Sequence, residues 1–143
     1  MPTLFELSVT GKLKVLVYGA SGAGKTAGAG TWPRSVWMVF DPGGITTLKN
    51  PALEQKYKYQ EKLVHYQEFR EGRRQKSGLP IAHNAFDDAC KYFDEWMKQA
   101  GEWDGVKTGA ELFDTWVIDS GTTLADCART KGIFVLGGQG LSK

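Results

Sequence analysis

Residues 13–26 read LKVLVYGASGAGKT, and this stretch determines the fold class that we expect for the chain. Its second half, 19–26, matches the pattern G-x-x-x-x-G-K-[ST] in full and follows the apolar run 15–18. An apolar run that leads into a glycine-rich loop predicts a buried parallel strand before a phosphate-binding loop. We therefore predict a first core strand over 12–18, followed by a helix that begins at Lys25 or one residue earlier.

Each residue type in the loop 19–26 suits the binding of a phosphate chain. Its three glycines allow backbone conformations that a Cβ would forbid, so successive N–H groups can turn toward an anion. The first turn of the following helix adds free N–H groups and a positive dipole end. Lys25 is expected to reach the β- and γ-phosphates, and the Thr26 hydroxyl to bind Mg²⁺. The predicted nucleotide-binding residues are Gly19, Ala20, Ser21, Gly22, Ala23, Gly24, Lys25 and Thr26.

The composition indicates a single domain over residues 1–143. The chain is 41% hydrophobic and 12% aromatic, which suffices for a core at this length. A net charge of +2 is too small to indicate a nucleic-acid partner by itself. Cys90 and Cys127 lie in no metal-binding spacing and are expected to be buried free thiols in helices. The N-terminus lacks a signal-peptide pattern, and no run is long enough for a membrane span, so a cytoplasmic protein without membrane contact is expected.

The chain on either side of this motif carries less chemistry. Residues 1–11 are expected to be a short lead-in with room for one edge strand, closed by Gly11. After the loop, Gly28 and Gly30 weaken the predicted helix, so tertiary packing must hold it.

Residues 35–40 (SVWMVF) predict a second strand, which ends in Asp41-Pro42-Gly43-Gly44. In an open α/β sheet, ligands lie beyond the carboxyl ends of the strands, so Asp41 would lie near the nucleotide if this strand is beside the first. The same sequence also suits a simple turn opened by Asp41. Both interpretations stay open at this stage.

Residues 51–78 are rich in charged and aromatic side chains and contain a predicted third strand over 63–66. Between positions 54 and 76 there are seven basic and four acidic residues. The basic residues in 56–76 are interleaved with Tyr57, Tyr59, Tyr66 and Phe69. Such a stretch could bind single-stranded DNA by charge and base stacking. The charge pattern favours a solvated, partly flexible face over that interpretation.

Residues 84–100 predict the clearest helix, with Asn84 as its N-cap and Gly101 as its end. We expect its buried stripe to be Phe86, Ala89, Cys90, Phe93, Trp96, Met97 and Ala100. A polar loop is expected to follow as far as about Ala110. His65 and His83 have no partner at metal-ligand spacing, so no metal role is expected for them.

Residues 116–118 form an apolar strand that ends in Asp119, the form of a Walker B element. A carboxylate at this strand tip is expected to hold Mg²⁺ together with Thr26. The next residue is Ser120 rather than glutamate, which argues against ATPases that carry an Asp-Glu pair here. A helix over 122–131 should follow, and the apolar run 133–136 is either a strand or the helix end.

Taken together, VLVYGASGAGKT, FDPGG and TWVIDSGTTL resemble the RecA-like P-loop ATPases. The resemblance is to phage-encoded nucleotide-binding proteins with an AAA-type domain, linked to single-strand annealing and recombination, and it covers about residues 12–130. It implies a three-layer α/β/α fold with a mainly parallel sheet, in which 24–26 bind phosphate and Mg²⁺ and Asp119 is the Walker B acid.

Two departures from that family affect the expectations. RecA proteins carry a catalytic glutamate two positions after the Asp that ends the second strand, and Gly43 stands there in this chain. Either Asp41 positions the attacking water instead, or turnover is slow. In addition, only 24 residues follow Asp119, so the chain is expected to match the N-terminal two-thirds of the fold and to be incomplete at its C-terminal end.

The expected function is binding of ATP with Mg²⁺ and hydrolysis by in-line attack of water. Lys25 would stabilise developing charge, Thr26 and Asp119 would hold the metal, and Asp41 would orient water. The resemblance places this activity in phage DNA recombination, in the cytoplasm of a bacterial or phage-infected cell. An arginine finger would have to come from a neighbouring subunit, so a homo-oligomer is expected.

Two alternatives to an ATPase stay open. The first is a nucleotide-binding regulatory or assembly module without turnover, which Gly43 and the short C-terminal part favour. The second is a small-molecule kinase. It would normally carry an arginine-rich lid after the third strand, whereas Arg129 is the only arginine beyond Arg74.

Overall fold

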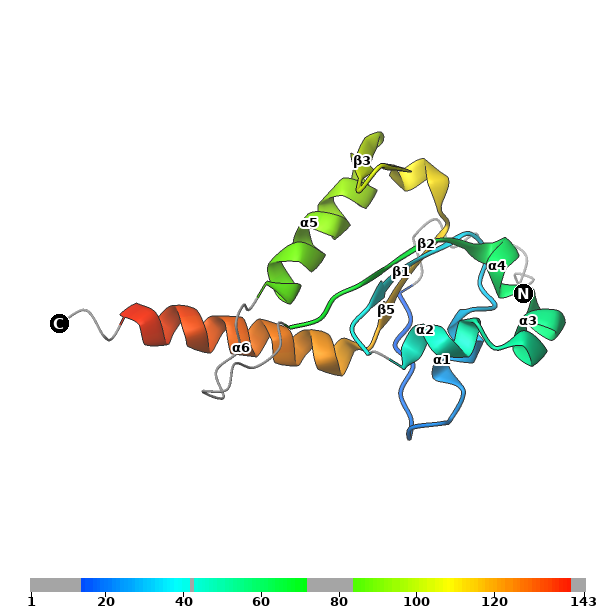
Figure 1. Cartoon of the computed structure of the whole chain (residues 1–143), viewed down its shortest axis with the longest axis horizontal. Coiled ribbons are helices and arrows are strands. Elements are labelled where there is room, and N and C mark those ends of the chain that lie inside the picture. The colour runs from blue at the N-terminus through cyan, green and yellow to red at the C-terminus, as the bar shows by residue number, and fades with distance from the viewer. Residues whose placement is uncertain (1–13, 42, 72–83, 140–143) are drawn as a thin grey trace, which may run out of the picture.

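The computed structural model has a mixed α/β architecture and describes residues 14–41, 43–71 and 84–139 (Figure 1). A three-stranded parallel sheet lies at its centre, in the order β2 (Leu63–Glu68), β1 (Ser35–Val39), β5 (Thr115–Asp119). The three strands confirm those predicted over 35–40, 63–66 and 115–119. Parallel pairing places their carboxyl ends at one edge of the sheet, where the candidate site lies.

Strand β1 is the most deeply buried element among those described. All five of its residues are buried, and Phe40 directly after it is also buried. Val36 and Met38 belong to one hydrophobic cluster, whereas Trp37 and Val39 belong to another on the opposite face. A continuous apolar run without alternation is what a strand covered on both faces requires.

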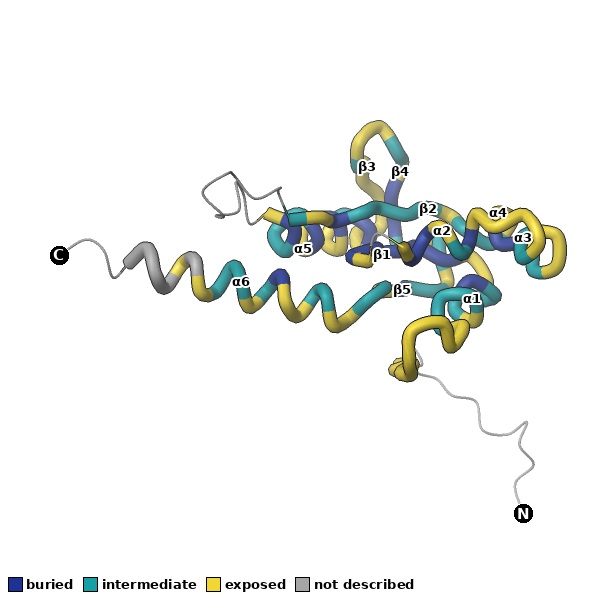
Figure 2. The backbone as a smooth tube through the Cα atoms, turned by 60° about the horizontal axis from the view of Figure 1, so that its bottom comes forward, coloured by how far each residue is buried: buried dark blue, intermediate teal, exposed yellow. Residues whose placement is uncertain are grey.

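Helices pack on both faces of the sheet. α5 (Ala85–Met97) and α6 (Gly121–Gln139) contribute residues to the cluster around Val36 and Met38. Four short helices pack around Trp37 on the other face: α1 (Lys25–Ala29), α2 (Gly44–Leu48), α3 (Pro51–Tyr57) and α4 (Tyr59–Lys62). Figure 2 shows β1 as buried and β2 and β5 as mostly half-buried, with α6 running outward from the end of β5. Figure 1 shows the same course of α6, which includes the apolar run 133–136 as helix.

Helix α5 was predicted with the right type and start, but it ends at Met97 rather than at residue 100, and only Ala89 and Trp96 of the predicted stripe are fully buried. Its buried residues are Ala85, Ala89, Tyr92 and Trp96, whereas Cys90 is exposed and Phe93 and Met97 are 40% and 41% exposed. Both stripes have helical spacing, so periodicity alone did not distinguish them. The observed face places the Tyr92 ring in an aromatic cluster with Phe69, Trp96, Trp103 and Trp116. The prediction that Cys90 is buried is therefore wrong, and the prediction for Cys127 is confirmed.

A hairpin replaces the polar loop expected after α5. Strands β3 (Gly101–Trp103) and β4 (Val106–Thr108) pair antiparallel, with Trp103 opposite Val106. The two residues between them are Asp104 and Gly105, with φ of 45° and 78°. An Asp-Gly pair between short β-forming runs is the strongest local hairpin signal, and it could have been recognised in the sequence.

The predicted first strand is not formed. Residues 14–18 have no regular structure and are exposed, with Leu16 and Tyr18 at 87% and 88% relative exposure. Residues 12 and 13 lie outside the described part. The described sheet consists of β2, β1 and β5, so segment 14–18 is paired with none of its strands. Without a neighbouring strand, an apolar run cannot satisfy its backbone groups in a sheet, so local sequence alone did not determine its burial.

Candidate functional site

The phosphate loop, residues 19–26, leads from the exposed segment 14–18 into helix α1. Gly22 and Gly24 adopt φ of 78° and 82°, which side chains with a Cβ disfavour. The Lys25 ammonium donates to the Gly19 and Ala20 carbonyl oxygens at 2.9 and 2.8 Å. The lysine therefore lies across the mouth of its own loop, in reach of any anion that the loop holds.

Several amides of the phosphate loop are available for an added acceptor. The Ala23 N–H donates to the Ala20 carbonyl at 3.2 Å. Within the described ranges, the N–H groups of Ser21, Gly22 and Gly24 have no acceptor. Consecutive free N–H groups beside an ammonium form the kind of concave donor set that binds phosphate. The chemistry of these donors fits a polyphosphate.

Two predicted metal-binding residues meet across 93 positions of sequence. The Thr26 hydroxyl donates to Oδ2 of Asp119 at 2.9 Å, which joins the start of α1 to the carboxyl end of β5. Hydroxyl and carboxylate oxygens are hard ligands that suit Mg²⁺, which usually takes few protein ligands and completes its shell with phosphate and water. No group of three or more His, Cys, Asp or Glu residues forms a metal cage in the part of the chain that is described. The donor set thus fits a metal that arrives with a phosphate ligand.

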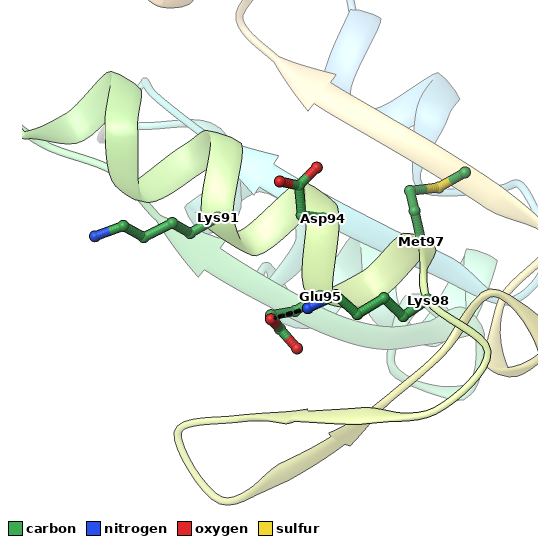
Figure 3. Close-up of a pocket in the computed structure, with 5 residues that line it drawn as sticks. All are labelled: Lys91, Asp94, Glu95, Met97 and Lys98. Carbon is green, nitrogen blue, oxygen red and sulfur yellow. Dashed lines mark hydrogen bonds and ion pairs between the residues drawn. The ribbon is translucent and has the colours of Figure 1, made fainter.

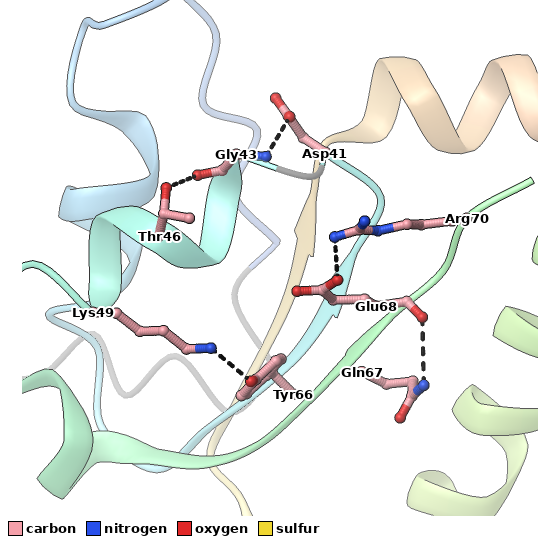
Figure 4. Close-up of polar contacts among 8 residues, drawn as sticks. All are labelled: Asp41, Gly43, Thr46, Lys49, Tyr66, Gln67, Glu68 and Arg70. Atoms are coloured by element: carbon pink, nitrogen blue, oxygen red, sulfur yellow. Dashed lines mark hydrogen bonds and ion pairs between the residues drawn. The ribbon is translucent and has the colours of Figure 1, made fainter.

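Asp41 lies at the same sheet edge as Asp119. Its N–H lies 3.3 Å from the Asp119 carbonyl oxygen, so the backbone brings the two residues side by side. Its Oδ1 accepts a hydrogen bond from the Gly43 N–H at 2.9 Å, as Figure 4 shows. Asp41 therefore opens the turn, as one interpretation of the sequence predicted. Its backbone lies beside Asp119, but Asp41 is not among the residues that line the groove described below, so a role near the nucleotide stays a prediction.

The sequence analysis missed Gly44 as a residue of the site. A Cβ built on Gly44 would lie 2.6 Å from Oδ2 of Asp119, closer than real contacts allow. The absence of a side chain is therefore what admits the Asp119 carboxylate to the position where it meets Thr26. The only signal in the sequence was the paired glycine after Asp41-Pro42, which we interpreted as turn chemistry alone.

An elongated groove of about 740 Å³, which we call the edge groove, extends from the phosphate loop along strand β5. Its polar end contains Lys25, Thr26, Asp119 and Ser120. Its apolar part is lined by Val15, Leu16, Val17, Tyr18, Ala29, Trp32, Trp37, Trp116, Val117, Ile118 and Leu124. A separate hollow of about 370 Å³ lies on α5, where Figure 3 shows charged side chains and Met97 pointing outward. That hollow shares no residue with the edge groove and carries no comparable donor set.

His65 packs against the aromatic side chains of α5. Its ring stacks on Trp96 at a centroid distance of 5.5 Å, and its Nε2 is buried without a hydrogen-bond partner. Burial lowers the pKa of His65, and the charge of Asp104 opposes this shift. His83 lies outside the described residues. The stacked imidazole of His65 fits packing, and no metal-binding group of the described residues includes it.

The basic and aromatic stretch 56–76 is only partly described, up to residue 71. Tyr59 and Phe69 are 1% and 4% exposed, so their rings belong to the core and cannot stack on bases. Lys49 Nζ lies 5.1 Å from the centroid of the Tyr66 ring and donates a hydrogen bond to the Tyr66 hydroxyl (Figure 4). Binding of single-stranded DNA by this stretch stays a prediction, with fewer available aromatic rings than expected.

Comparisons with models of protein families, with curated proteins and with solved structures found no match for this chain. The site must therefore be interpreted from its own residues and geometry. Among the described helices, none is both long enough and apolar enough to cross a membrane.

Proposed function

We propose that the chain binds ATP with Mg²⁺ at the polar end of the edge groove and hydrolyses it. The observation that carries this proposal is the contact between Thr26 and Asp119 at 2.9 Å beside the loop that holds Lys25. A general glycine-rich turn does not require a hydroxyl, an ammonium and a distant carboxylate to meet at one sheet edge. Phosphate with a divalent cation requires all three.

The residues of the site have separable roles in this proposal. Lys25 would leave the carbonyl groups of its loop and pair with the β- and γ-phosphates. Thr26 and Asp119 would hold Mg²⁺, which would neutralise part of the phosphate charge. Asp41, which is exposed beside Asp119, would orient water for in-line attack on the γ-phosphate, releasing ADP and phosphate.

The arginines of the described residues support an oligomeric ATPase. Arg34 pairs with Asp114, Arg70 with Glu68, and Arg129 with Asp126. All three are thus engaged elsewhere. Arg73 and Arg74 lie outside the described residues. We propose a homo-oligomer in which a neighbouring copy supplies the arginine that stabilises the transition state. From the resemblance of the motifs alone, we place the activity in phage DNA recombination or single-strand annealing in the host cytoplasm.

One observation favours a second candidate, a nucleotide-binding regulatory or assembly module without turnover. The Asp41 carboxylate already accepts the Gly43 N–H, and Gly43 offers no side chain to act as a base. If the turn keeps Asp41 engaged, nucleotide would bind and remain intact. A small-molecule kinase has less support, because none of the arginines just described faces the phosphate loop.

Nucleotide binding is tested first, by calorimetry with ATP in Mg²⁺ and in EDTA. We expect Lys25→Ala to abolish binding, because the loop then lacks its only ammonium. Lys91→Ala is the matched control, since Lys91 is exposed on α5 and lies outside the edge groove. Unchanged affinity in the Lys25 variant would contradict the assignment.

Turnover is tested separately, by phosphate release with and without single-stranded DNA over a salt series. Release that rises with DNA and falls steeply with salt supports a recombination-type ATPase. Binding without release under every condition supports the regulatory or assembly module instead.

A further inference from the structure

Strand β5 has one paired and one unpaired edge within the described sheet. The Asp119 carbonyl oxygen accepts the Phe40 N–H at 2.6 Å, so Asp119 turns its backbone groups toward β1. Successive residues of a strand turn their N–H and C=O groups to opposite sides. The backbone groups of Trp116 and Ile118 therefore point away from β1, to the outer edge.

The apolar part of the edge groove follows this outer edge. Its lining includes Trp37 and Val117, which belong to the hydrophobic cluster on one face of the sheet. It also includes Trp116 and Leu124, which pack on the other face. Because β1 occupies the inner edge of β5, a groove that reaches both faces passes along the outer edge. The unpaired N–H and C=O groups of β5 are therefore available to a ligand in the groove.

Apolar side chains that line the groove are exposed to solvent. Leu16 and Tyr18 are 87% and 88% exposed, and Val15, Val17 and Ile118 are between 43% and 52% exposed. Exposed apolar surface that gathers in one groove is typical of a ligand-binding site. A flat and largely apolar part of a ligand would remove this surface from water.

Trp116 adds a hydrogen-bond donor and a firmly packed ring to the groove. Phe93 and Phe113 lie at centroid distances of 5.1 and 5.5 Å from its ring, so aromatic neighbours limit its movement. Its Nε1 is buried and has no hydrogen-bond partner among the described residues. A buried N–H without an acceptor costs free energy, so a ligand that brings an acceptor would gain affinity.

We propose that the apolar part of the edge groove binds the adenine base of the nucleotide whose phosphates occupy the loop 19–26. Adenine is flat, and its amino donor lies beside a ring nitrogen that accepts. The Trp116 carbonyl oxygen would accept from the amino group, and the Ile118 N–H would donate to the ring nitrogen. A further ring nitrogen is an acceptor for Trp116 Nε1. This inference rests on the proposed function and adds the part of the site that recognises the base.

The order of residues along β5 suits a nucleotide. Asp119, at the carboxyl end of the strand, meets Thr26 where the metal and the phosphates would bind. Trp116 lies three residues earlier, which is about 10 Å along a strand. The groove is continuous between these two positions, so the ribose would lie between the phosphates and the base.

Calorimetry on the full chain with Mg²⁺ tests the proposal by comparing ATP with ribose 5′-triphosphate, which lacks only the base. We expect ATP to bind about tenfold more tightly or better, because the base adds stacking and hydrogen bonds. Equal affinities would overturn the base site and leave the phosphate site of the proposed function intact. Binding of neither compound would overturn both.

NMR spectroscopy then locates the base. ATP should shift the signals of the Ile118 amide and the Trp116 indole N–H, whereas ribose 5′-triphosphate should leave the indole signal in place. The Val117 amide faces β1 and is the internal control. We also expect contacts between the adenine protons and the Ile118 amide. Contacts of this amide with segment 15–18 in the ATP complex would overturn the proposal, because that segment would then occupy the outer edge of β5.

A pair of tryptophan variants tests the indole donor. Trp116→Phe should lower ATP affinity about threefold to tenfold and leave ribose 5′-triphosphate affinity unchanged. Trp103→Phe is the matched control, because Trp103 also packs on Tyr92 and has a buried Nε1 without a partner, but does not line the groove. Equal effects of the two substitutions on ATP affinity would contradict the proposal. If Trp116→Phe fails to fold, the NMR contacts in the unaltered chain decide the question.

Discussion

Two apolar runs of similar character, 15–18 and 35–39, lie in opposite environments. Strand β1 (35–39) is buried at every position, between two paired strands and two hydrophobic clusters. Segment 15–18 has no paired strand within the described residues, and all four of its residues are exposed. The difference shows that the burial of an apolar run depends on the strands and helices around it, which the hydropathy of the run does not reveal.

The candidate site joins these two regions. Asp119 and Asp41 come from the carboxyl edge of the packed sheet, whereas Lys25 and Thr26 follow the exposed segment. The contact between Thr26 and Asp119 is therefore the link between a well-packed half and an exposed half of the site. A ligand held by both halves would stabilise the folded chain by mass action.

The largest predicted effect separates the two apolar runs directly. Trp37 is fully buried in β1, so Trp37→Ala should cost about 3–5 kcal/mol of unfolding free energy. Leu16 is 87% exposed, so Leu16→Ala should cost less than about 0.5 kcal/mol. Urea unfolding of both variants measures the two values. A cost for Leu16→Ala close to that of Trp37→Ala would remove the distinction between the regions.

The second prediction uses two glycines at the border between the regions. A Cβ on Gly30 would lie 2.5 Å from Leu48 and 2.9 Å from the Tyr59 ring, so Gly30→Ala should destabilise the chain by about 1–3 kcal/mol. A Cβ on Gly28 meets nothing within 4 Å. Gly28→Ala, the matched control, should therefore stabilise α1 by about 0.5–1 kcal/mol. Thermal unfolding that shifts both variants in the same direction would show that α1 is not packed as described.

Some of the contacts described above were predictable from the sequence, whereas others were not. The three sheet strands and the pairing of Thr26 with Asp119 followed from apolar runs and motif spacing. The close approach at Gly30, the carboxylate beside Gly44 and the buried face of α5 depend on distant residues that no local pattern specifies. The hairpin at Asp104 and Gly105 is different, because its turn signal was local and was overlooked.

The third prediction sharpens the comparison at the site itself. Because a Cβ on Gly44 would lie 2.6 Å from Oδ2 of Asp119, Gly44→Ala should displace this carboxylate and weaken Mg²⁺-dependent ATP binding about tenfold, or about 1.4 kcal/mol. Gly43→Ala places its Cβ 3.5 Å from the Asp41 carboxylate, an ordinary contact, and should bind normally. Calorimetry with and without Mg²⁺ measures the ATP affinities of the two variants. Equal affinities would show that Asp119 takes no part in metal binding.

The smallest predicted effect is a pH dependence of stability that arises from His65, which packs between the sheet and α5. Burial lowers the pKa of His65 in the folded chain, so the unfolded chain takes up a proton first as the pH falls. Stability should therefore be lost below about pH 6.5, the ordinary histidine pKa, and the loss should level off below the folded pKa. In His65→Phe, whose ring can still stack on Trp96, this part of the pH dependence should vanish.

Urea unfolding of the unaltered chain and of His65→Phe, between about pH 8 and about pH 5, measures this difference. As the pH falls through the acid range, the unfolding free energy of the unaltered chain should decrease relative to that of His65→Phe. His83 is retained in both proteins, so its titration cancels to first order. A gap that stays constant would show that His65 is as accessible to protons in the folded chain as in the unfolded one. The packing of β2 against α5 would then be looser than that of β1 between its two clusters.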